Sequence, residues 1–216
     1  MSNNTFKLHR EALDPSRQKL LRILVKIDKE IVLGGGTALS LQIVHRQSFD
    51  FDFFSKTELS KKLLEVVRQT IKISRVSRDM ADELTFYDTN NIKITFLYYP
   101  FGKVFDFVKT EDHLNYFPLK TVAFQKAYTI GRRGVYRDYF DIYALLKGKY
   151  ITLKEIIGGA EDIYGTVFNP KIFLEQLVYF TDLTNFEIMP ISKSQKIPHH
   201  GDVKKFLEAT VREYLY

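Results

Sequence analysis

The chain has 216 residues, of which 45% are hydrophobic and 27% are charged, an ordinary composition for one large globular domain or two small ones. It has no cysteine, which excludes disulfide scaffolds, thiolate zinc sites and thiol catalysis. The 32 basic and 26 acidic residues leave a net charge of +6. This charge would attract a polyanion such as RNA or a nucleotide, although many solvated domains carry as much.

The sequence shows neither an export signal nor a membrane-spanning segment. The first fourteen residues lack an apolar core, and the longest stretch without charge, residues 31–44, is interrupted by three glycines. A spanning helix needs about 20 predominantly apolar residues. We therefore expect a cytoplasmic protein with no membrane association.

The first half of the chain alternates between helical and strand-like patterns. Asp14 followed by Pro15 predicts a helix start, with the aspartate as N-cap and the proline in the first turn. A short apolar run then leads into three glycines and a second helix. The predicted elements after the first helix are a strand at 31–33, a helix at 37–46, a strand at 49–54, a helix at 58–71 and a hairpin formed by 84–87 and 92–98.

After residue 116 the apolar periodicity becomes helical almost throughout. Helices are predicted at 118–130, 135–147, 152–164, 170–183 and 202–214. Thr152 and Glu155 fit a capping box at the third of these. The sequence therefore predicts the α+β class, with a mixed sheet and flanking helices in residues 1–115 and a helical region, residues 116–216, packed on that core.

A glycine-rich turn is the first candidate site. Gly34, Gly35, Gly36 and Thr37 lie where a strand meets a helix, so a ligand could approach the backbone and phosphate could bind the N–H groups of the helix N-terminus. The turn is neither a P-loop nor a dinucleotide fingerprint, because Leu39 stands where the third glycine of the fingerprint belongs. A tight turn that only allows close packing is the alternative.

Two aspartates follow this turn. In the run from Phe49 to Phe53, alternation along a strand places Asp50 and Asp52 on one face, roughly 6.6 Å apart, and three phenylalanines on the other. Two carboxylates at that distance repel by about 2.5 kcal/mol at an effective dielectric of 20. A bound Mg²⁺ would remove that cost, since magnesium takes one or two carboxylates together with substrate phosphates. A solvated edge strand is the alternative.

The helical half holds a second group of charged residues. They are Lys126, Arg132, Arg133, Arg137, Asp138 and Asp141. Lys126 falls within the apolar stripe of its helix, and Asp138 lies at the margin of the next stripe. A lysine that faces a core needs an anion. The two residues either form a structural ion pair or reach a bound nucleotide.

Together these motifs resemble the nucleotidyltransferase AbiEii/AbiGii toxin family. The resemblance rests on the segments Gly35–Leu39, His45–Arg46, Ser48, Asp50–Phe54, Lys126 and Arg137–Tyr143, in that order and spacing. It implies a fold like that of DNA polymerase β-type nucleotidyltransferases, with a mixed sheet and a helical C-terminal part. It also implies the toxin of a bacterial toxin–antitoxin pair, or a role in phage defence, with a cognate antitoxin as partner.

The resemblance assigns roles to single residues. Gly35, Gly36, Thr37, Asp50 and Asp52 match the family's glycine turn and Asp-x-Asp strand, while Lys126 and Asp138 match its downstream lysine and aspartate. The prediction is therefore a transfer from an NTP to an acceptor such as tRNA or another RNA. Asp50 and Asp52 would hold Mg²⁺, the turn from Gly34 would bind phosphate, and Lys126 and Arg46 would neutralise phosphate charge.

One position departs from the pattern of the superfamily. A third acidic residue is often present on a neighbouring strand, and Thr95 stands about where it would be sought, with Asp88 and Asp106 as substitutes. A non-catalytic nucleotide- or nucleic-acid-binding module with a degenerate metal site is therefore the alternative function. The five histidines show no zinc-like spacing.

Overall fold

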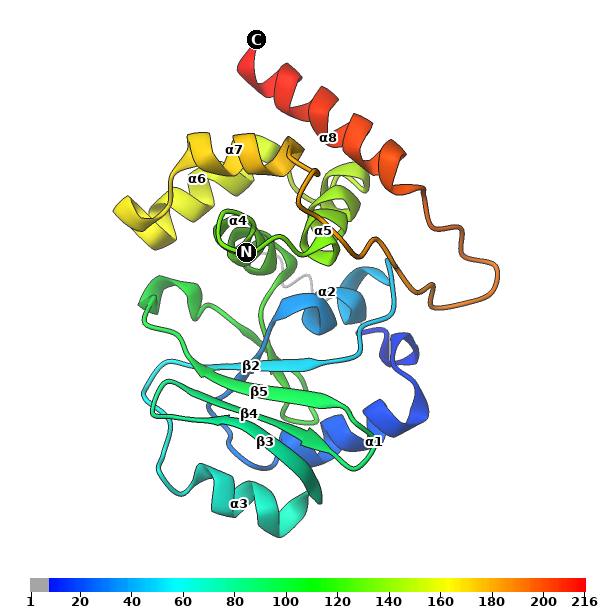
Figure 1. Cartoon of the computed structure of the whole chain (residues 1–216). Coiled ribbons are helices and arrows are strands. Elements are labelled where there is room, and N and C mark those ends of the chain that lie inside the picture. The colour runs from blue at the N-terminus through cyan, green and yellow to red at the C-terminus, as the bar shows by residue number, and fades with distance from the viewer. Residues whose placement is uncertain (1–7) are drawn as a thin grey trace. The chain divides into compact units, whose positions relative to one another are not determined.

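A computed structural model describes residues 8–216, coloured along the chain in Figure 1. The first seven residues, which belong to the stretch judged to lack an export signal, lie outside it. The chain divides into two compact units, one up to Pro118 and one formed by Leu119–Tyr216. Within residues 8–216 the first unit holds all the strands, and the second is helical. This confirms the predicted α+β class.

The first unit is built on a seven-stranded mixed sheet in the order β3-β4-β5-β2-β1-β7-β6. Its central strand β2 pairs antiparallel with β1 and parallel with β5. The predicted hairpin is the antiparallel pair β4 and β5. The strands are β1 (Val32–Leu33), β2 (Phe51–Ser55), β3 (Ile73–Asp79), β4 (Glu83–Asp88), β5 (Lys93–Tyr98), β6 (Val108–Lys109) and β7 (Asn115–Tyr116).

Helices lie on both faces of this sheet. Figure 1 shows α2 on one side and α1 and α3 on the other. The helices of this unit are α1 (Pro15–Leu24), α2 (Gly35–Ile43) and α3 (Leu63–Thr70), with short 3₁₀ turns at Arg10–Ala12 and Gly102–Val104. Asp14 caps α1 as predicted, because its side chain accepts a hydrogen bond from the Arg17 N–H.

A row of phenylalanines forms the core beneath the central strands. The ring of Phe53 on β2 stacks on Phe96 of β5, with centroids 5.5 Å apart, and Phe96 stacks on Phe86 of β4 at 6.2 Å. All three rings are buried. Since side chains alternate along a strand, Asp52 lies on the opposite face from this row.

The second unit consists of five helices and one 3₁₀ turn. They are α4 (Leu119–Ile130), α5 (Tyr136–Lys147), α6 (Leu153–Tyr164), a 3₁₀ turn at Gly165–Val167, α7 (Pro170–Val178) and α8 (His200–Leu215). The capping box predicted at α6 is present. Within residues 8–216 no helix is both long and apolar enough to cross a bilayer.

Several helix and strand boundaries differ from those predicted from the sequence. The helix predicted from residue 58 begins only at Leu63, and the one predicted to run to residue 183 ends at Val178, because Tyr179 adopts an extended backbone. Strand β3 was missed because most of its side chains are exposed and polar, so it shows no clear alternation. β6 and β7 were missed because each has two residues, too few for a period.

Candidate functional site

The glycine turn begins helix α2 next to Asp52. Gly35 has a φ of +61°, a conformation that side chains disfavour. A β-carbon at this position would stand 2.8 Å from Asp52 Oδ2. Glycine is therefore required here twice, once for the backbone conformation and once for the space that the carboxylate occupies.

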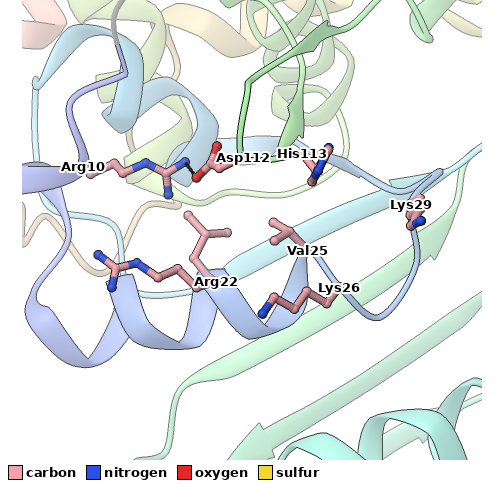
Figure 2. A pocket seen from close by; sticks show the side chains of 8 residues that line it. Arg10, Arg22, Val25, Lys26, Lys29, Asp112 and His113 are labelled. Atoms are coloured by element: carbon pink, nitrogen blue, oxygen red, sulfur yellow. Dashed lines mark hydrogen bonds and ion pairs between the residues drawn. The ribbon is translucent and has the colours of Figure 1, made fainter.

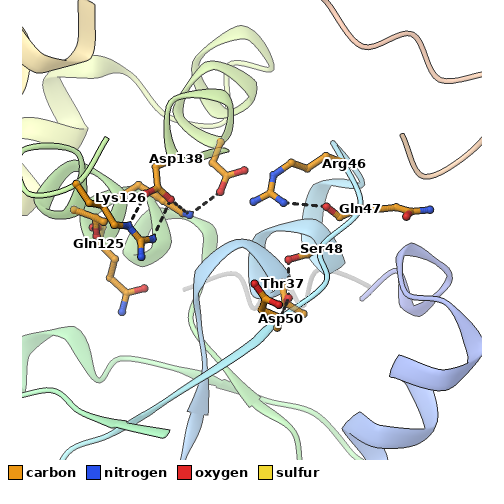
Figure 3. A network of polar contacts seen from close by, with 11 residues as sticks. Thr37, Arg46, Gln47, Ser48, Asp50, Gln125, Lys126 and Asp138 are labelled. Carbon is orange, nitrogen blue, oxygen red and sulfur yellow. Dashed lines mark hydrogen bonds and ion pairs between the residues drawn. The ribbon is translucent and has the colours of Figure 1, made fainter. Parts of the chain in front are cut away.

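Hydrogen bonds tie this turn to the aspartate segment. The Gly34 N–H donates to the carbonyl of Asp52 at 2.9 Å. The Thr37 hydroxyl donates to the carbonyl of Asp50 and lies 2.8 Å from Ser48 Oγ, as Figure 3 shows. These bonds to the aspartates use their main-chain oxygens and not their carboxylates. The turn and the aspartate pair, predicted from separate motifs, thus form one cluster, which we call the sheet cluster.

The two aspartates occupy different local structures. Asp52 lies on β2 between the fully buried rings of Phe51 and Phe53, whereas Asp50 comes just before the strand begins. Both aspartates are half-buried. The predicted strand of residues 49–54 is therefore shifted, because the chain is held to Thr37 at Asp50 before it joins the sheet at Phe51.

The third acidic residue of the superfamily is absent from the neighbouring strand. Asp52 pairs with Thr95 of β5, whose hydroxyl accepts a hydrogen bond from Thr85 of β4 at 3.3 Å. Asp88 cannot substitute, because its carboxylate accepts the N–H groups of the turn that follows β4. Among residues 8–216 no three acidic or histidine side chains converge on a point that could hold a metal.

Arg46 is part of the sheet cluster. Its side chain is buried, and its guanidinium occupies the space into which a β-carbon at Gly36 would project. The guanidinium donates to the Gln47 carbonyl at 2.9 Å, while the Arg46 carbonyl accepts the Ser40 hydroxyl at 2.5 Å. A buried cation is therefore fixed close to the glycine turn.

The helical unit holds a separate cluster of charges, also drawn in Figure 3. Lys126 Nζ on α4 lies 2.5 Å from Asp138 Oδ1 and 2.7 Å from Asp141 Oδ2, both on α5. Arg133 Nε donates to Asp138 Oδ2 at 2.9 Å. We call these four residues the helical cluster. The predicted pair of Lys126 and Asp138 exists, and Asp141 is a second partner that follows Asp138 by three residues on the same helix face.

The helical cluster is a buried group of paired charges. Lys126 and both aspartates are almost fully buried, while the Arg133 side chain is 58% exposed. Burial acts to raise the pKa of Asp138, but the charges of Lys126 and Arg133 outweigh it and the pKa is lowered. Asp138 is thus held ionised, and two cations balance two carboxylates.

Two buried polar groups accompany the helical cluster. Burial, with the charges of Asp182 and Asp138, raises the pKa of Tyr139 to about 12. Within the described part of the chain, neither the Tyr139 hydroxyl nor the Gln125 amide has a hydrogen-bond partner. Sequence reasoning missed both residues, since tyrosine and glutamine at buried helix positions give no signal that distinguishes them from packing residues.

Comparisons with known proteins agree with the resemblance seen in the sequence. Residues 19–209 match the model of the family described as nucleotidyl transferase AbiEii toxin, type IV TA system. An uncharacterized protein of Aquifex aeolicus (strain VF5) is 31% identical over 213 residues, covering 97% of both chains. The solved structure of MenT4, a nucleotidyltransferase toxin from Mycobacterium tuberculosis H37Rv, is similar in fold, with a TM-score of 0.56 and 17% identity, over 94% of this chain and 84% of that one.

Proposed function

The chain belongs to the nucleotidyl transferase AbiEii toxin family, and we propose that it transfers a nucleotidyl group from an NTP to RNA in a magnesium-dependent reaction. The family makes it a nucleotidyltransferase of a toxin–antitoxin system. The contact of the Asp52 carboxylate with the glycine turn carries the proposal, because it joins the family's two nucleotide-handling motifs in one place.

Magnesium suits the donors of the sheet cluster. Mg²⁺ is usually held by one or two carboxylates, with substrate phosphates and water completing its shell, so a third protein acid is not required. Asp50 and Asp52 would hold it, and both are half-exposed and can reach a ligand. When bound, the metal would supply charge stabilisation for the phosphates of the NTP.

The residues of the sheet cluster then have distinct roles. The N–H groups at the start of α2, from Gly35 to Thr37, bind phosphate oxygens, since they have no partner within the helix. Arg46 adds positive charge close to that turn. An acceptor hydroxyl attacks the α-phosphorus and loses its proton, and the bond to the leaving pyrophosphate breaks. These groups stabilise charge that develops in the transition state.

We assign Lys126 and Asp138 to the same reaction. Lys126 would neutralise phosphate charge, and Asp138 and Asp141 would hold its ammonium in place through the contacts at 2.5 and 2.7 Å. The alternative is that the helical cluster only stabilises its unit. Lys126→Met separates the two in the folded protein, because a purely structural lysine leaves NTP affinity unchanged.

RNA as acceptor and the cellular role complete the proposal. The net charge of +6 favours a polyanionic acceptor. We place the protein in the cytoplasm, where a cognate antitoxin would oppose it and where phage defence would operate.

Labelled NTPs tested one at a time, with Mg²⁺ and total cellular RNA, examine the proposal directly. We expect label from at least one NTP in an RNA fraction, and none when Mg²⁺ is removed or when Asp50→Asn is used. Absence of label from RNA, protein and small-molecule fractions would contradict transfer.

The replacement of the third acid by Thr95 favours one rival, a binding module without catalysis. Calorimetry with NTP, with and without Mg²⁺, separates the two. Binding that ignores Mg²⁺ and survives Asp50→Asn would identify the binding module.

A further inference from the structure

A pocket lies in the first unit, alongside helix α1. It has a volume of about 400 Å³, within the range of ligand pockets. Figure 2 shows Arg10, Asp112 and His113 on one side of it and Arg22, Val25 and Lys26 on the other. The lining is completed by Leu21 and Lys29. We call it the α1 pocket.

Most of the polar groups that line the α1 pocket are cationic. Arg10 is bound to Asp112, with 2.5 Å between Nη2 and Oδ2, so these two charges cancel. Among residues 8–216, Arg22, Lys26 and Lys29 have no carboxylate within ion-pairing distance. Three uncompensated cations around the half-buried, apolar Val25 would attract an anion that also carries an apolar or ring-shaped part.

The turn that carries Asp112 and His113 is well fixed. His113 has a φ of +67°, an uncommon conformation for a residue other than glycine. The turn is held by Thr110, whose carbonyl accepts the His113 N–H at 3.1 Å and whose hydroxyl accepts the Leu114 N–H at 3.0 Å. Backbone strain of this kind persists only where the surroundings hold it, so this wall of the pocket is preorganised.

The arrangement of charge along α1 favours a chain of phosphates over a single anion. The helix, Pro15–Leu24, contains no acidic residue. Lys19, Arg22 and Lys26 recur at intervals of three and four residues, so they form one exposed row on the helix surface and its C-terminal continuation. Lys29 extends the row beyond the helix. A small anion would use one or two of these cations, whereas a nucleic-acid backbone can contact them in succession.

The α1 pocket is not the proposed NTP site. Figure 1 shows α1 and α2 on opposite sides of the sheet, and the carboxylate of Asp52 lies beside the start of α2. The α1 pocket and the sheet cluster share no residue. An RNA is large enough to contact both sides of the unit, and a mononucleotide is not.

We propose that the α1 pocket and its row of cations bind the phosphodiester backbone of the acceptor RNA, with a base or ribose on the half-buried Val25. The inference rests on the proposed function, because it takes RNA to be the acceptor. It adds a docking site that is distinct from the residues of the reaction. Backbone contacts of this kind position a nucleic acid without reading its sequence.

RNA binding by a triple variant, Arg22→Gln/Lys26→Gln/Lys29→Gln, tests the proposal. The matched control, Lys61→Gln/Lys62→Gln/Arg68→Gln, removes the same charge from exposed positions around α3. Fluorescence anisotropy with a labelled single-stranded RNA of about 20 nucleotides is measured over a range of salt concentrations. Each lost phosphate contact lowers the slope of log K against log salt by about 0.7, so three contacts predict about 100-fold weaker binding near 0.1 M salt.

The outcomes separate this inference from the proposed function. We expect the triple variant to lose RNA affinity and salt dependence relative to the control, and to keep the wild-type affinity for NTP. Equal RNA binding by the triple variant and its control would overturn the inference, even if the wild type transfers nucleotides. Displacement of the RNA by poly-glutamate at equal charge would assign the site to an acidic protein. Displacement by AMP at low concentration would assign the site to a mononucleotide. Either result would overturn the inference. Failure of the wild type to transfer label, with RNA binding as expected, would contradict the proposed function alone.

Discussion

The two polar clusters of this protein are built in opposite ways. In the sheet cluster, the Gly34 N–H and the Thr37 hydroxyl donate to main-chain oxygens of Asp52 and Asp50, and both aspartate side chains are half-buried. In the helical cluster, side chains bind side chains, and Lys126, Asp138 and Asp141 are almost fully buried. Backbone anchoring holds the turn and the strand together without depending on side-chain charge, whereas mutual ion pairing makes each charge depend on its partners. Substitutions should therefore affect function first in the sheet cluster and stability first in the helical cluster.

The largest effect on stability is expected from Lys126→Met. Removal of the ammonium takes away the cation that lies 2.5 Å from Asp138 and 2.7 Å from Asp141, and breaking a buried pair in this way costs about 3–5 kcal/mol. Urea denaturation measures the change. The control is Lys120→Met on the same helix, which loses only an exposed pair with Glu155 and should cost less than about 1 kcal/mol. Equal losses of unfolding free energy in the two variants would show that the buried contacts of Lys126 stabilise the protein no more than an exposed ion pair does.

Asp52→Asn should reduce activity strongly and leave stability almost unchanged. It removes one of two like charges and no packing contact, so the free energy of unfolding should stay the same or rise slightly. Transfer of label from NTP should fall by at least about 100-fold, equivalent to about 2.7 kcal/mol of transition-state stabilisation. Asp79→Asn, an exposed position on the edge strand β3, serves as the control for charge. An unfolded Asp52→Asn protein would show that the face of β2 that carries Asp52 is needed for folding. Full activity of this variant would show that Asp52 does not hold the metal.

Acid should destabilise the helical cluster. The pKa of Asp138 is lowered in the folded state, so its contribution to stability is present above its unfolded pKa of about 3.9 and is lost as the pH falls through the folded value. Below about pH 5, the free energy of unfolding should therefore fall by up to about 1.4 kcal/mol per pH unit for this one group. Asp138→Asn should show a shallower slope than the wild type, with Asp79→Asn as background. Identical slopes for all three proteins would exclude Asp138 as a source of the acid sensitivity.

The sequence predicted the features that depend on neighbouring residues better than those that depend on contacts between distant segments. Local signals were sufficient for the Asp14 cap and the Thr152 capping box, because each is a bond between residues three apart in the chain. The glycine turn was found from its three successive glycines. The sequence predicted that the strand carrying Thr95 would lie beside the strand carrying Asp52, as it does. It could not predict that the two strands run parallel, because this depends on the order of all the strands in the sheet. Asp141 was named among the charges of its helix and in the resemblance, but not as a partner of Lys126, since nothing local distinguishes the aspartate that reaches Lys126 from one that faces solvent.

A smaller loss of stability than that of Lys126→Met, and the sharpest test of backbone anchoring, is expected from Gly35→Ala. The left-handed conformation should cost alanine about 1–2 kcal/mol. The new methyl group would also displace the Asp52 carboxylate, since its carbon would lie 2.8 Å from Oδ2. The control is Gly158→Ala on α6, where no atom lies within 4 Å of the added carbon and where alanine should stabilise the helix by about 0.5–1 kcal/mol. Thermal unfolding and NTP transfer are measured on both proteins. We expect Gly35→Ala to lose more activity than its small loss of stability accounts for, because at the temperature of the assay most of the protein is still folded. A folded Gly35→Ala protein with wild-type transfer would mean that the turn only packs against β2, and the assignment of phosphate binding to the start of α2 would then be wrong.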